Sequence, residues 1–197
     1  MSLKIHTTVI QLPQARRMLG LMEILNNLHK YDRHLFARVF RQGERRMVIP
    51  LAKALSRSGD GYLHLLLPLL LWQLKLPGFD DFIALLAASL VLERLVYWVL
   101  KNSLKRKRPQ QAVPGLRSLI VASDQFSFPS GHSSGAFLLA TTLVLVYGVP
   151  VAAIYLWAGG VALSRVVLGV HFPGDIVAGG LMGSAIALLC AIQLGGF

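Results

Sequence analysis

Five apolar segments constrain this chain more than any other feature of its sequence. They cover roughly residues 62–76, 82–101, 131–147, 151–168 and 173 to the C-terminus. Segments of this length and apolarity are typical of helices that cross a bilayer. The 54% content of hydrophobic residues exceeds that of an ordinary soluble domain. The sequence therefore predicts an all-α, polytopic membrane helix bundle with about five transmembrane helices.

Turn and capping residues separate these segments. The first ends at Lys75-Leu76-Pro77-Gly78 and is short for a spanning helix, and Asp80-Asp81 caps the second. Gly148-Val149-Pro150 forms a tight turn, and Pro173 suits the first turn of the last helix. Between residues 102 and 128 we expect a polar loop.

Two pairs of glycines are spaced four residues apart within the apolar segments. They are Gly131 with Gly135, and Gly179 with Gly183. This spacing lets helices approach closely in a membrane. We infer close packing from it and nothing more.

Residues 1–58 have a different character, because cations alternate there with apolar residues at helical spacing. The segment is too charged to span a bilayer. It predicts one or two amphipathic helices lying in the membrane interface. The alternative is that these helices pack onto another part of the protein.

The net charge of +11 raises the question of partners. Nucleic acid is one class of partner for a basic chain, but here the cations flank apolar segments and few aromatic residues lie among them. Anionic lipid headgroups and a phosphorylated substrate explain the charge better. We therefore expect a bilayer with anionic headgroups as a partner and no nucleic acid.

Three clusters of residues suited to phosphate chemistry lie between residues 101 and 175. The clusters are Lys101 with Arg108-Pro109, then Pro129-Ser130-Gly131-His132, then Ser164-Arg165 with His171 and Asp175. Guanidinium groups make forked contacts with phosphate oxygens, and histidines move protons or attack phosphorus near neutral pH. A carboxylate near a histidine fixes its tautomer. A Ser-Gly pair before an apolar run offers backbone N–H groups to an anion at a helix start.

The order of the apolar segments brings the three clusters to one face of the membrane. The second segment ends at Lys101 and the third begins at Gly131, so both lie on that face. The fourth returns to the face near Arg165, and the fifth leaves it at Asp175. Two helix N-termini then direct positive dipole ends toward the same place. The pattern predicts a phosphate-binding site at one rim of the bundle.

These residues resemble the signature of the type 2 phosphatidic acid phosphatase (PAP2) superfamily. The family pattern is Lys, six residues, Arg-Pro; then Pro-Ser-Gly-His; then Ser-Arg, five residues, His, three residues and Asp. Every signature position and internal spacing is matched in this sequence. The resemblance covers about residues 60–195 and implies two units, a basic amphipathic interfacial segment (1–58) and a PAP2-like transmembrane catalytic domain (59–197).

The resemblance implies a membrane-integral phosphatase that acts through a phosphohistidine. His171 would be the nucleophile, Asp175 would orient it, and His132 would be the general acid and base. The phosphoryl oxygens would be held by Lys101, Arg108, Ser130, Gly131 and Arg165. The motif includes only one acid, which is too few for a two-metal clamp, so we expect neither a metal nor a cofactor.

A site at the bilayer surface suits a membrane lipid phosphate as the substrate. Phosphatidylglycerol phosphate, phosphatidic acid and polyprenyl diphosphates are all handled in the family. A lipid phosphotransferase that uses the same phosphohistidine is the alternative, and a non-catalytic lipid-binding protein is a third hypothesis. The intact histidines and Asp175 argue against the third.

The distribution of cations bears on sidedness. Eighteen of the twenty Lys and Arg residues lie on the face that carries the clusters, Arg94 lies within the second segment, and only Lys75 lies on the other face. The positive-inside rule predicts a cytoplasmic active site in a multi-pass protein of the bacterial inner membrane. The active site faces outward in many relatives, so this expectation differs from what is common in the family.

Glu93 and Arg94 lie in the middle of the second segment. Because charges at this depth are costly, both side chains are expected to face protein and not lipid. Arg94 is seven residues from Lys101, so it either points toward the site or forms an internal pair with Glu93.

Overall fold

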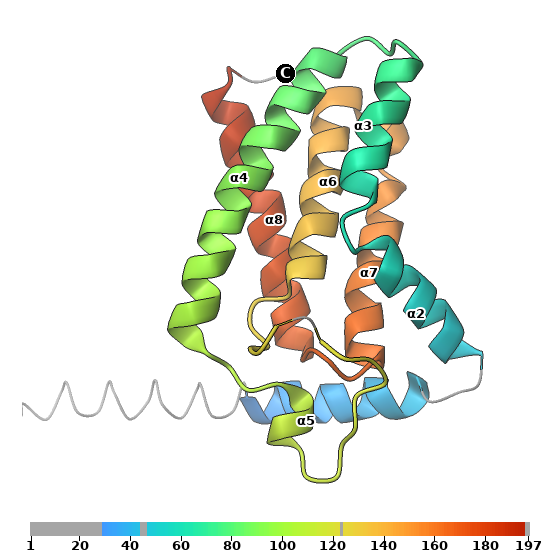
Figure 1. Cartoon of the computed structure of the whole chain (residues 1–197), viewed down its shortest axis with the longest axis vertical. Coiled ribbons are helices and arrows are strands. Elements are labelled where there is room, and N and C mark those ends of the chain that lie inside the picture. The colour runs from blue at the N-terminus through green and yellow to red at the C-terminus, as the bar shows by residue number, and fades with distance from the viewer. Residues whose placement is uncertain (1–28, 44–46, 123, 196–197) are drawn as a thin grey trace, which may run out of the picture.

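The computed structural model describes residues 29–43, 47–122 and 124–195, and within these ranges it contains helices and loops but no strand. In chain order the elements are α2 (Val48–Ser58), α3 (Leu63–Gln73), α4 (Phe79–Leu104), α5 (Pro109–Ala112), α6 (Gly131–Tyr147), the 3₁₀ helix η1 (Val149–Val151), α7 (Ile154–Val167) and α8 (Pro173–Gln193). Residues 29–43 are also helical. Figure 1 shows an upright bundle with residues 29–43 lying across one end.

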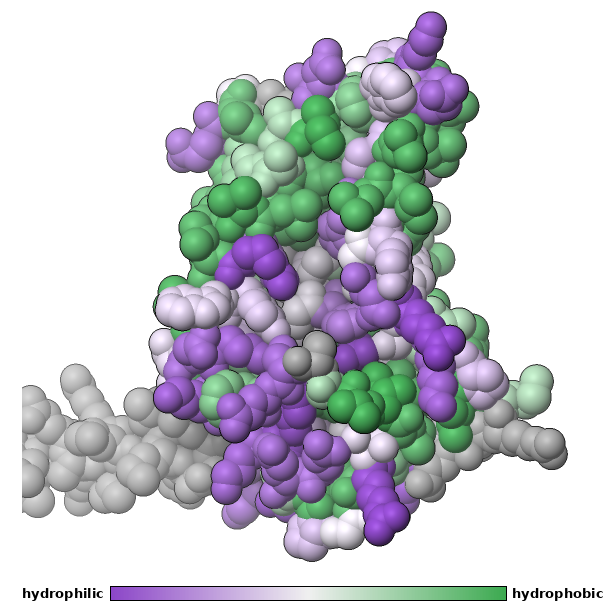
Figure 2. All heavy atoms as spheres, viewed as in Figure 1, coloured by the Kyte–Doolittle hydropathy of each residue, from purple (hydrophilic) through white to green (hydrophobic). Residues whose placement is uncertain are grey.

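Each predicted apolar segment forms a helix, which confirms the fold class. Residues 79–112, 149–167 and 173–193 are long and apolar enough to cross a membrane, and α3 and α6 are shorter apolar helices. Apolar side chains cover the upper part of the bundle in Figure 2, and polar ones gather at the end that carries α5 and its loops. The bundle therefore has an apolar body, and its larger polar region lies at the end that carries α5.

Two elements differ from the prediction. The helix α3 has only 11 residues and ends at Gln73, so it spans about 16 Å. The loop expected at 102–128 is shorter, since α4 continues to Leu104 and α5 begins at Pro109. Proline suits the first turn of a helix, and this explains where α5 begins.

The helix α6 lies at the centre of the bundle and packs against α4, α7 and α8. Its contact with α8 is the closest, because two glycines of α8 face the backbone of α6. A Cβ atom at Gly179 would overlap the carbonyl oxygen of Ser130, and one at Gly183 would overlap that of Ser134. The close approach that the glycine spacing indicated is confirmed here.

Both α6 and α8 begin at the polar end of the bundle. The Ser130 side chain caps α6 by accepting from the backbone N–H of Ser133. In α8 the Asp175 side chain accepts from the backbone N–H of Phe172, at 2.7 Å. The N–H of Ser130 donates to the carbonyl oxygen of Asp175, at 3.1 Å, so the two helix starts are joined directly.

The described part of the N-terminal segment packs onto the bundle. Phe36 and Phe40 are buried against Phe172 and its neighbours, and α2 packs on α7. The alternative of helices packed onto the protein therefore holds for residues 29–43 and α2. Residues 1–28 and 44–46 lie outside the described residues, and the boundary at residue 58 stays a prediction.

The packing of α6 on α8 predicts that Gly183→Ala destabilises the protein. The new methyl group would meet backbone atoms, which cannot move aside cheaply, and such overpacking costs about 1–3 kcal/mol. We expect a lower melting temperature in detergent. Gly159→Ala in α7 is the control, because its methyl group would meet nothing within 4 Å. Equal melting temperatures for the two variants would contradict this packing.

Candidate active site

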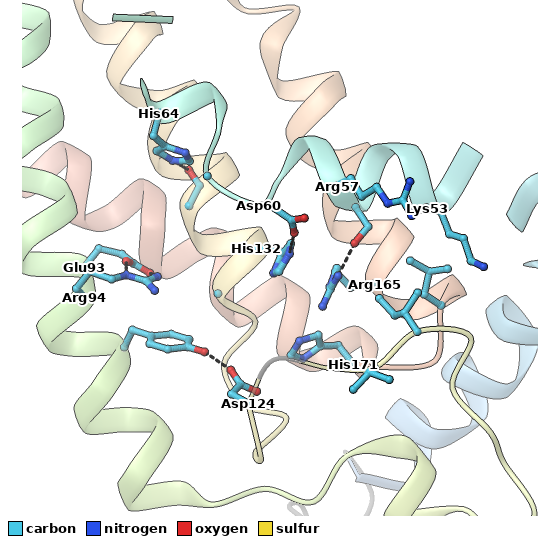
Figure 3. A pocket seen from close by; sticks show the side chains of 18 of the residues that line it. Lys53, Arg57, Asp60, His64, Glu93, Arg94, Asp124, His132, Arg165 and His171 are labelled. Atoms are coloured by element: carbon cyan, nitrogen blue, oxygen red, sulfur yellow. Dashed lines mark hydrogen bonds and ion pairs between the residues drawn. The ribbon is translucent and has the colours of Figure 1, made fainter. Parts of the chain in front are cut away.

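The three sequence clusters meet at one cavity of about 760 Å³ at the polar end of the bundle (Figure 3). Of the predicted site residues, five line the cavity: Arg108, Gly131, His132, Arg165 and His171. The other three, Lys101, Ser130 and Asp175, are buried beside it. The structure therefore gathers residues that are up to 74 positions apart in the chain, as the order of the helices predicted.

His171 lies between α7 and α8. Gly169 ends α7 in the left-handed conformation (φ 77°), which returns the chain toward the bundle. The His171 side chain is almost completely buried, and its Nε2 lies 3.5 Å from Nη1 of Arg108. Its Nδ1 lies 3.6 Å from Oδ2 of Asp175, close enough for an ion pair, but makes no hydrogen bond within the described residues. The ring thus directs Nδ1 to the carboxylate and Nε2 to the cavity.

The surroundings of His171 keep its ring neutral. The pKa of His171 is lowered to about 4, chiefly by burial and with a contribution from the charges of Arg108 and Arg165, while Asp175 acts in the opposite direction. A neutral imidazole with its proton on Nδ1 has a free lone pair on Nε2. A neutral imidazole of this kind is chemically capable of nucleophilic attack at neutral pH.

Asp175 is fully buried and has several partners. Its carboxylate accepts hydrogen bonds from the backbone N–H of Phe172, from the hydroxyl of Ser127 and from Nη1 of Arg106, the last at 2.6 Å. Because a buried carboxylate is costly without such partners, they fix its position. Its Oδ2 is also the carboxylate oxygen that lies nearest to Nδ1 of His171.

Arg106 corrects one expectation from the sequence. The basic run Lys105–Arg108 belongs to the segment expected to form a polar loop, and only Arg108 of this run was assigned to phosphate binding. Lys105 and Lys107 are indeed exposed, but Arg106 turns inward and pairs with Asp175 and, at 2.5 Å, with Asp32. The chain turns at Lys105, which has a φ of 45°, and a run of cations contains no signal for such a turn.

Lys101 and Arg108 share a carboxylate that the sequence did not bring to notice. Asp124 lies 2.9 Å from Nζ of Lys101, pairs with the Arg108 guanidinium and accepts a hydrogen bond of 2.5 Å from Tyr97. Burial would raise the pKa of Asp124, but these hydrogen bonds and the two cations outweigh it and hold the pKa at about 2. The carboxylate is therefore charged at every physiological pH.

Arg165 is a buried cation that faces the cavity. Its side chain comes from the last turn of α7 and donates from Nη1 to the hydroxyl of Ser56 in α2. Among the residues that the structure describes, its Nε has no hydrogen-bond partner and no acid pairs with it. The guanidinium is thus available to an anion in the cavity.

His132, at the start of α6, pairs with an acid from outside the motif. Its Nε2 lies 2.7 Å from Oδ1 of Asp60, which follows α2 (Figure 3). In the sequence Asp60 belongs to a turn, Ser58-Gly59-Asp60-Gly61, that indicates only a break between helices. The Ser130 hydroxyl is engaged with Ser133, at 3.0 Å, as part of the cap of α6.

Arg94 fulfils both alternatives that the sequence left open, because it pairs with Glu93 and also lines the cavity. Two hydrogen bonds of 2.5 and 2.7 Å join the guanidinium to the carboxylate. Glu93 is fully buried, as expected, but the Arg94 side chain is 55% exposed, so only one of the two faces protein throughout. Both residues line the cavity.

Metal binding has no obvious donor set in the described ranges. Within residues 29–43, 47–122 and 124–195, no group of three or more His, Cys, Asp or Glu side chains could hold a metal ion. Metal independence of the reaction stays a prediction.

The fold and the cavity define a helical membrane protein with a cationic site that contains two histidines. The sequence model described as "PAP2 superfamily" matches residues 82–196, which is more than half of the chain. This protein therefore belongs to the PAP2 superfamily, and the resemblance inferred from the motif is confirmed.

Curated relatives are phosphatases by name. Decaprenylphosphoryl-5-phosphoribose phosphatase of Mycobacterium tuberculosis is 26% identical over 138 residues, which cover 70% of this chain and 76% of that protein. Lipid A 1-phosphatase of Rhizobium etli is 36% identical over 116 residues, which cover 55% of this chain and 49% of that protein.

Two crystal structures share the fold. Aquifex aeolicus LpxE superposes with a TM-score of 0.71 and 23% identity, covering 81% of this chain and 93% of that one. A transmembrane PAP2-type phosphatidylglycerolphosphate phosphatase from Bacillus subtilis superposes with a TM-score of 0.67 and 23% identity. The match covers 85% of this chain and 86% of that one. At this identity the likeness establishes the arrangement of the helices.

The contacts of Arg106 predict that Arg106→Gln lowers kcat with little change in KM. The variant removes a cation that positions Asp175, so His171 loses its orientation while the cations that line the cavity remain. We expect a loss of about tenfold to a hundredfold, as for other groups that orient a catalytic side chain. Lys105→Gln and Lys107→Gln are matched controls on the exposed part of the same run. Equal kcat values in all three variants would contradict the positioning role.

The pKa of His171 predicts how stability depends on pH. In the folded state it is about 4, below the ordinary value of 6.5, so between these values the unfolded chain binds more protons. Stability therefore falls as the pH decreases from 6.5 toward 4, by about 3 kcal/mol in total from this residue. We expect the melting temperature of His171→Gln to change less with pH over this range than that of the wild-type protein. Parallel curves for the two proteins would show that His171 is not buried in the neutral form.

Proposed function

We propose that this protein is an integral membrane phosphatase that hydrolyses a lipid phosphate through a phosphohistidine intermediate. The observation that carries the proposal is the position of His171, whose Nε2 faces the cavity beside Arg108 while Nδ1 faces Asp175. The names of the relatives, each a phosphatase of a lipid-linked compound, support a lipid as the substrate.

The reaction has two steps on the same side chains. In the first, Nε2 of His171 attacks phosphorus, the bond from phosphorus to the lipid oxygen breaks, and His132 gives that oxygen a proton. In the second, His132 takes a proton from water, whose oxygen attacks phosphorus and displaces His171. Phosphate leaves and both histidines return to their starting states.

The cations act on the phosphoryl group in both steps. Arg108 and Arg165 line the cavity together with His171, and the buried Lys101 is joined to Arg108 through Asp124. The first turn of α6 adds backbone N–H groups, including that of Gly131, that have no partner within the helix. These groups would stabilise the charge on the transferring oxygens without help from a metal.

The substrate class follows from the position of the site. The cavity opens at the polar end of an apolar bundle, so a lipid can keep its tail in the membrane while its phosphate reaches the cations. Phosphatidylglycerol phosphate, phosphatidic acid and polyprenyl diphosphates fit this description. A lipid phosphotransferase with the same intermediate would instead pass the phosphoryl group to an acceptor.

Phosphate release from these three lipids in detergent tests the proposal. We expect release in the presence of a chelator, and a loss of at least about a thousandfold in His171→Ala, because the nucleophile is gone. His34→Ala is the control, since this histidine is exposed and outside the cavity. Radioactive phosphate that appears on an acceptor lipid would favour the phosphotransferase. Unchanged release from His171→Ala would show that the nucleophile is wrongly assigned.

We further propose that the active site faces the cytoplasm in a bacterial inner membrane. Cations crowd the end of the bundle that carries the cavity, and the positive-inside rule favours the cytoplasm for that end. Single cysteines at Gln111 and Gln73, in a variant without Cys190, report on the two ends. An impermeant thiol reagent added to intact cells should label the cysteine at position 73 and spare the one at 111. The reverse result would place the site outside.

A further inference from the structure

The cavity extends beyond the motif residues to the polar face of α2. Lys53, Ser56 and Arg57 line it, and Asp60 continues the same face just after the helix. Residues at these spacings share one face of a helix. The adjacent side of α2 packs on α7, where Ala52 is buried and Leu55 lies against Gly160. A segment that the sequence assigned to the membrane interface thus forms one wall of the site.

The charges of the cavity are unevenly compensated. Its three acids are each engaged: Glu93 pairs with Arg94, Asp124 with Arg108, and Asp60 with His132. Lys53 and Arg57 form no ion pair or side-chain hydrogen bond within the described ranges, although both line the cavity. Lys53 is partly buried, so its charge loses some of its solvation. The wall formed by α2 therefore carries two cations in excess.

These two cations lie beside the site of phosphoryl transfer. Figure 3 shows Lys53 and Arg57 on the same side of the cavity as Arg165, away from Glu93 and Arg94. The hydrogen bond from Arg165 to Ser56 connects the motif cation to the same face of α2. A phosphoryl group at Arg165 would thus have further positive charge close by. Since the motif already supplies three cations for that group, the additional pair suits a second anion.

We propose that Lys53 and Arg57 form a second anion-binding site for a further phosphate, or another anionic group, on the head of the lipid substrate. This inference rests on the proposed function and makes the substrate a lipid with more than one negative group. The competing source of the anion is a headgroup of the surrounding bilayer.

Two substrates with the same acyl chains distinguish these sources. Phosphatidic acid has a single phosphate, whereas phosphatidylglycerol phosphate has a second one. In the double variant Lys53→Gln, Arg57→Gln we expect kcat/KM to fall about tenfold or more for the second lipid and at most about twofold for the first, since charge-assisted contacts are lost only there. The double variant Lys105→Gln, Lys107→Gln removes the same charge from the exposed surface.

The results distinguish a second anion-binding site from general attraction to anionic headgroups. A larger loss of kcat/KM for the lipid with two phosphates supports the second site, provided that the control variant shows no such loss. Equal losses on both lipids would mean general attraction to anionic surfaces and would overturn it, as would no loss at all. A wild-type protein that releases phosphate from neither lipid in the panel would instead remove the proposed function, and the inference with it.

A separate observation concerns Asp124. One oxygen of its carboxylate meets Lys101 and Tyr97, the other meets Arg108, and its side chain is 34% exposed toward the cavity. Its two oxygens thus hold positions on two of the three motif cations. A phosphoryl group also presents pairs of charged oxygens to such cations. Both anions cannot occupy the same donors.

We infer that Asp124 is an internal competitor that the substrate phosphate must displace. The apparent affinity for phosphate is then the intrinsic affinity multiplied by the fraction of molecules in which Asp124 has released the cations. The opposite possibility is that Asp124 keeps Lys101 and Arg108 in place for the substrate. The two roles predict effects of opposite sign.

Binding of inorganic phosphate to the purified protein in detergent separates these roles without any lipid assay. We expect Asp124→Ala and Asp124→Asn to bind phosphate more tightly, by about tenfold, because the competing carboxylate is gone. Asp60→Asn removes a negative charge from the same cavity without touching Lys101 or Arg108, and it should have a smaller effect. Weaker binding in both Asp124 variants, with unchanged melting temperatures, would assign Asp124 to positioning and overturn the inference.

Discussion

The buried carboxylate of Asp175 is the interaction on which the polar end of this bundle depends. It belongs to the first turn of α8, yet its partners come from the loop at Ser127, from Arg106 after α4 and from His171. A buried carboxylate without partners would cost several kcal/mol, so these segments are held to α8 together. Arg106 passes the constraint on to Asp32, which also accepts from the N–H of Gly174. The segment of His171, the cationic loop and the helix of residues 29–43 are thereby held to one another.

The packing of α6 on α8 determines the position of His132 and of the first turn of α6. Glycines at 179 and 183 bring the two backbones together, so both helix starts reach the same cavity. His132 and Gly131 of α6 then line the same cavity as His171, Arg108 and Arg165. The site is therefore a consequence of helix packing at the apolar core as well as of the charged residues. Bulkier residues at these positions would push the starts of α6 and α8 apart.

The sequence predicted the spanning segments and the gathering of the motif residues, because periodicity and the order of the helices determine both. It could not predict the supporting acids and Arg106, since these contacts depend on loop geometry. Asp124 lies in a loop without any periodic pattern, and Asp60 lies in a turn that reads only as a break. The inward turn of Arg106 depends on the left-handed backbone at Lys105. Likewise, an amphipathic pattern fits a helix in the interface and a helix that forms a cavity wall, and only tertiary contacts separate the two for α2.

A structure of the protein with orthovanadate bound would test the central claim most directly. Vanadate adopts the five-coordinate geometry of a phosphoryl group under attack, so it reports which atom lies in line. The arrangement described here predicts a bond from vanadium to Nε2 of His171, with Arg108 and Arg165 on its oxygens and His132 opposite. Vanadium bonded to His132, or bound away from both histidines, would contradict it.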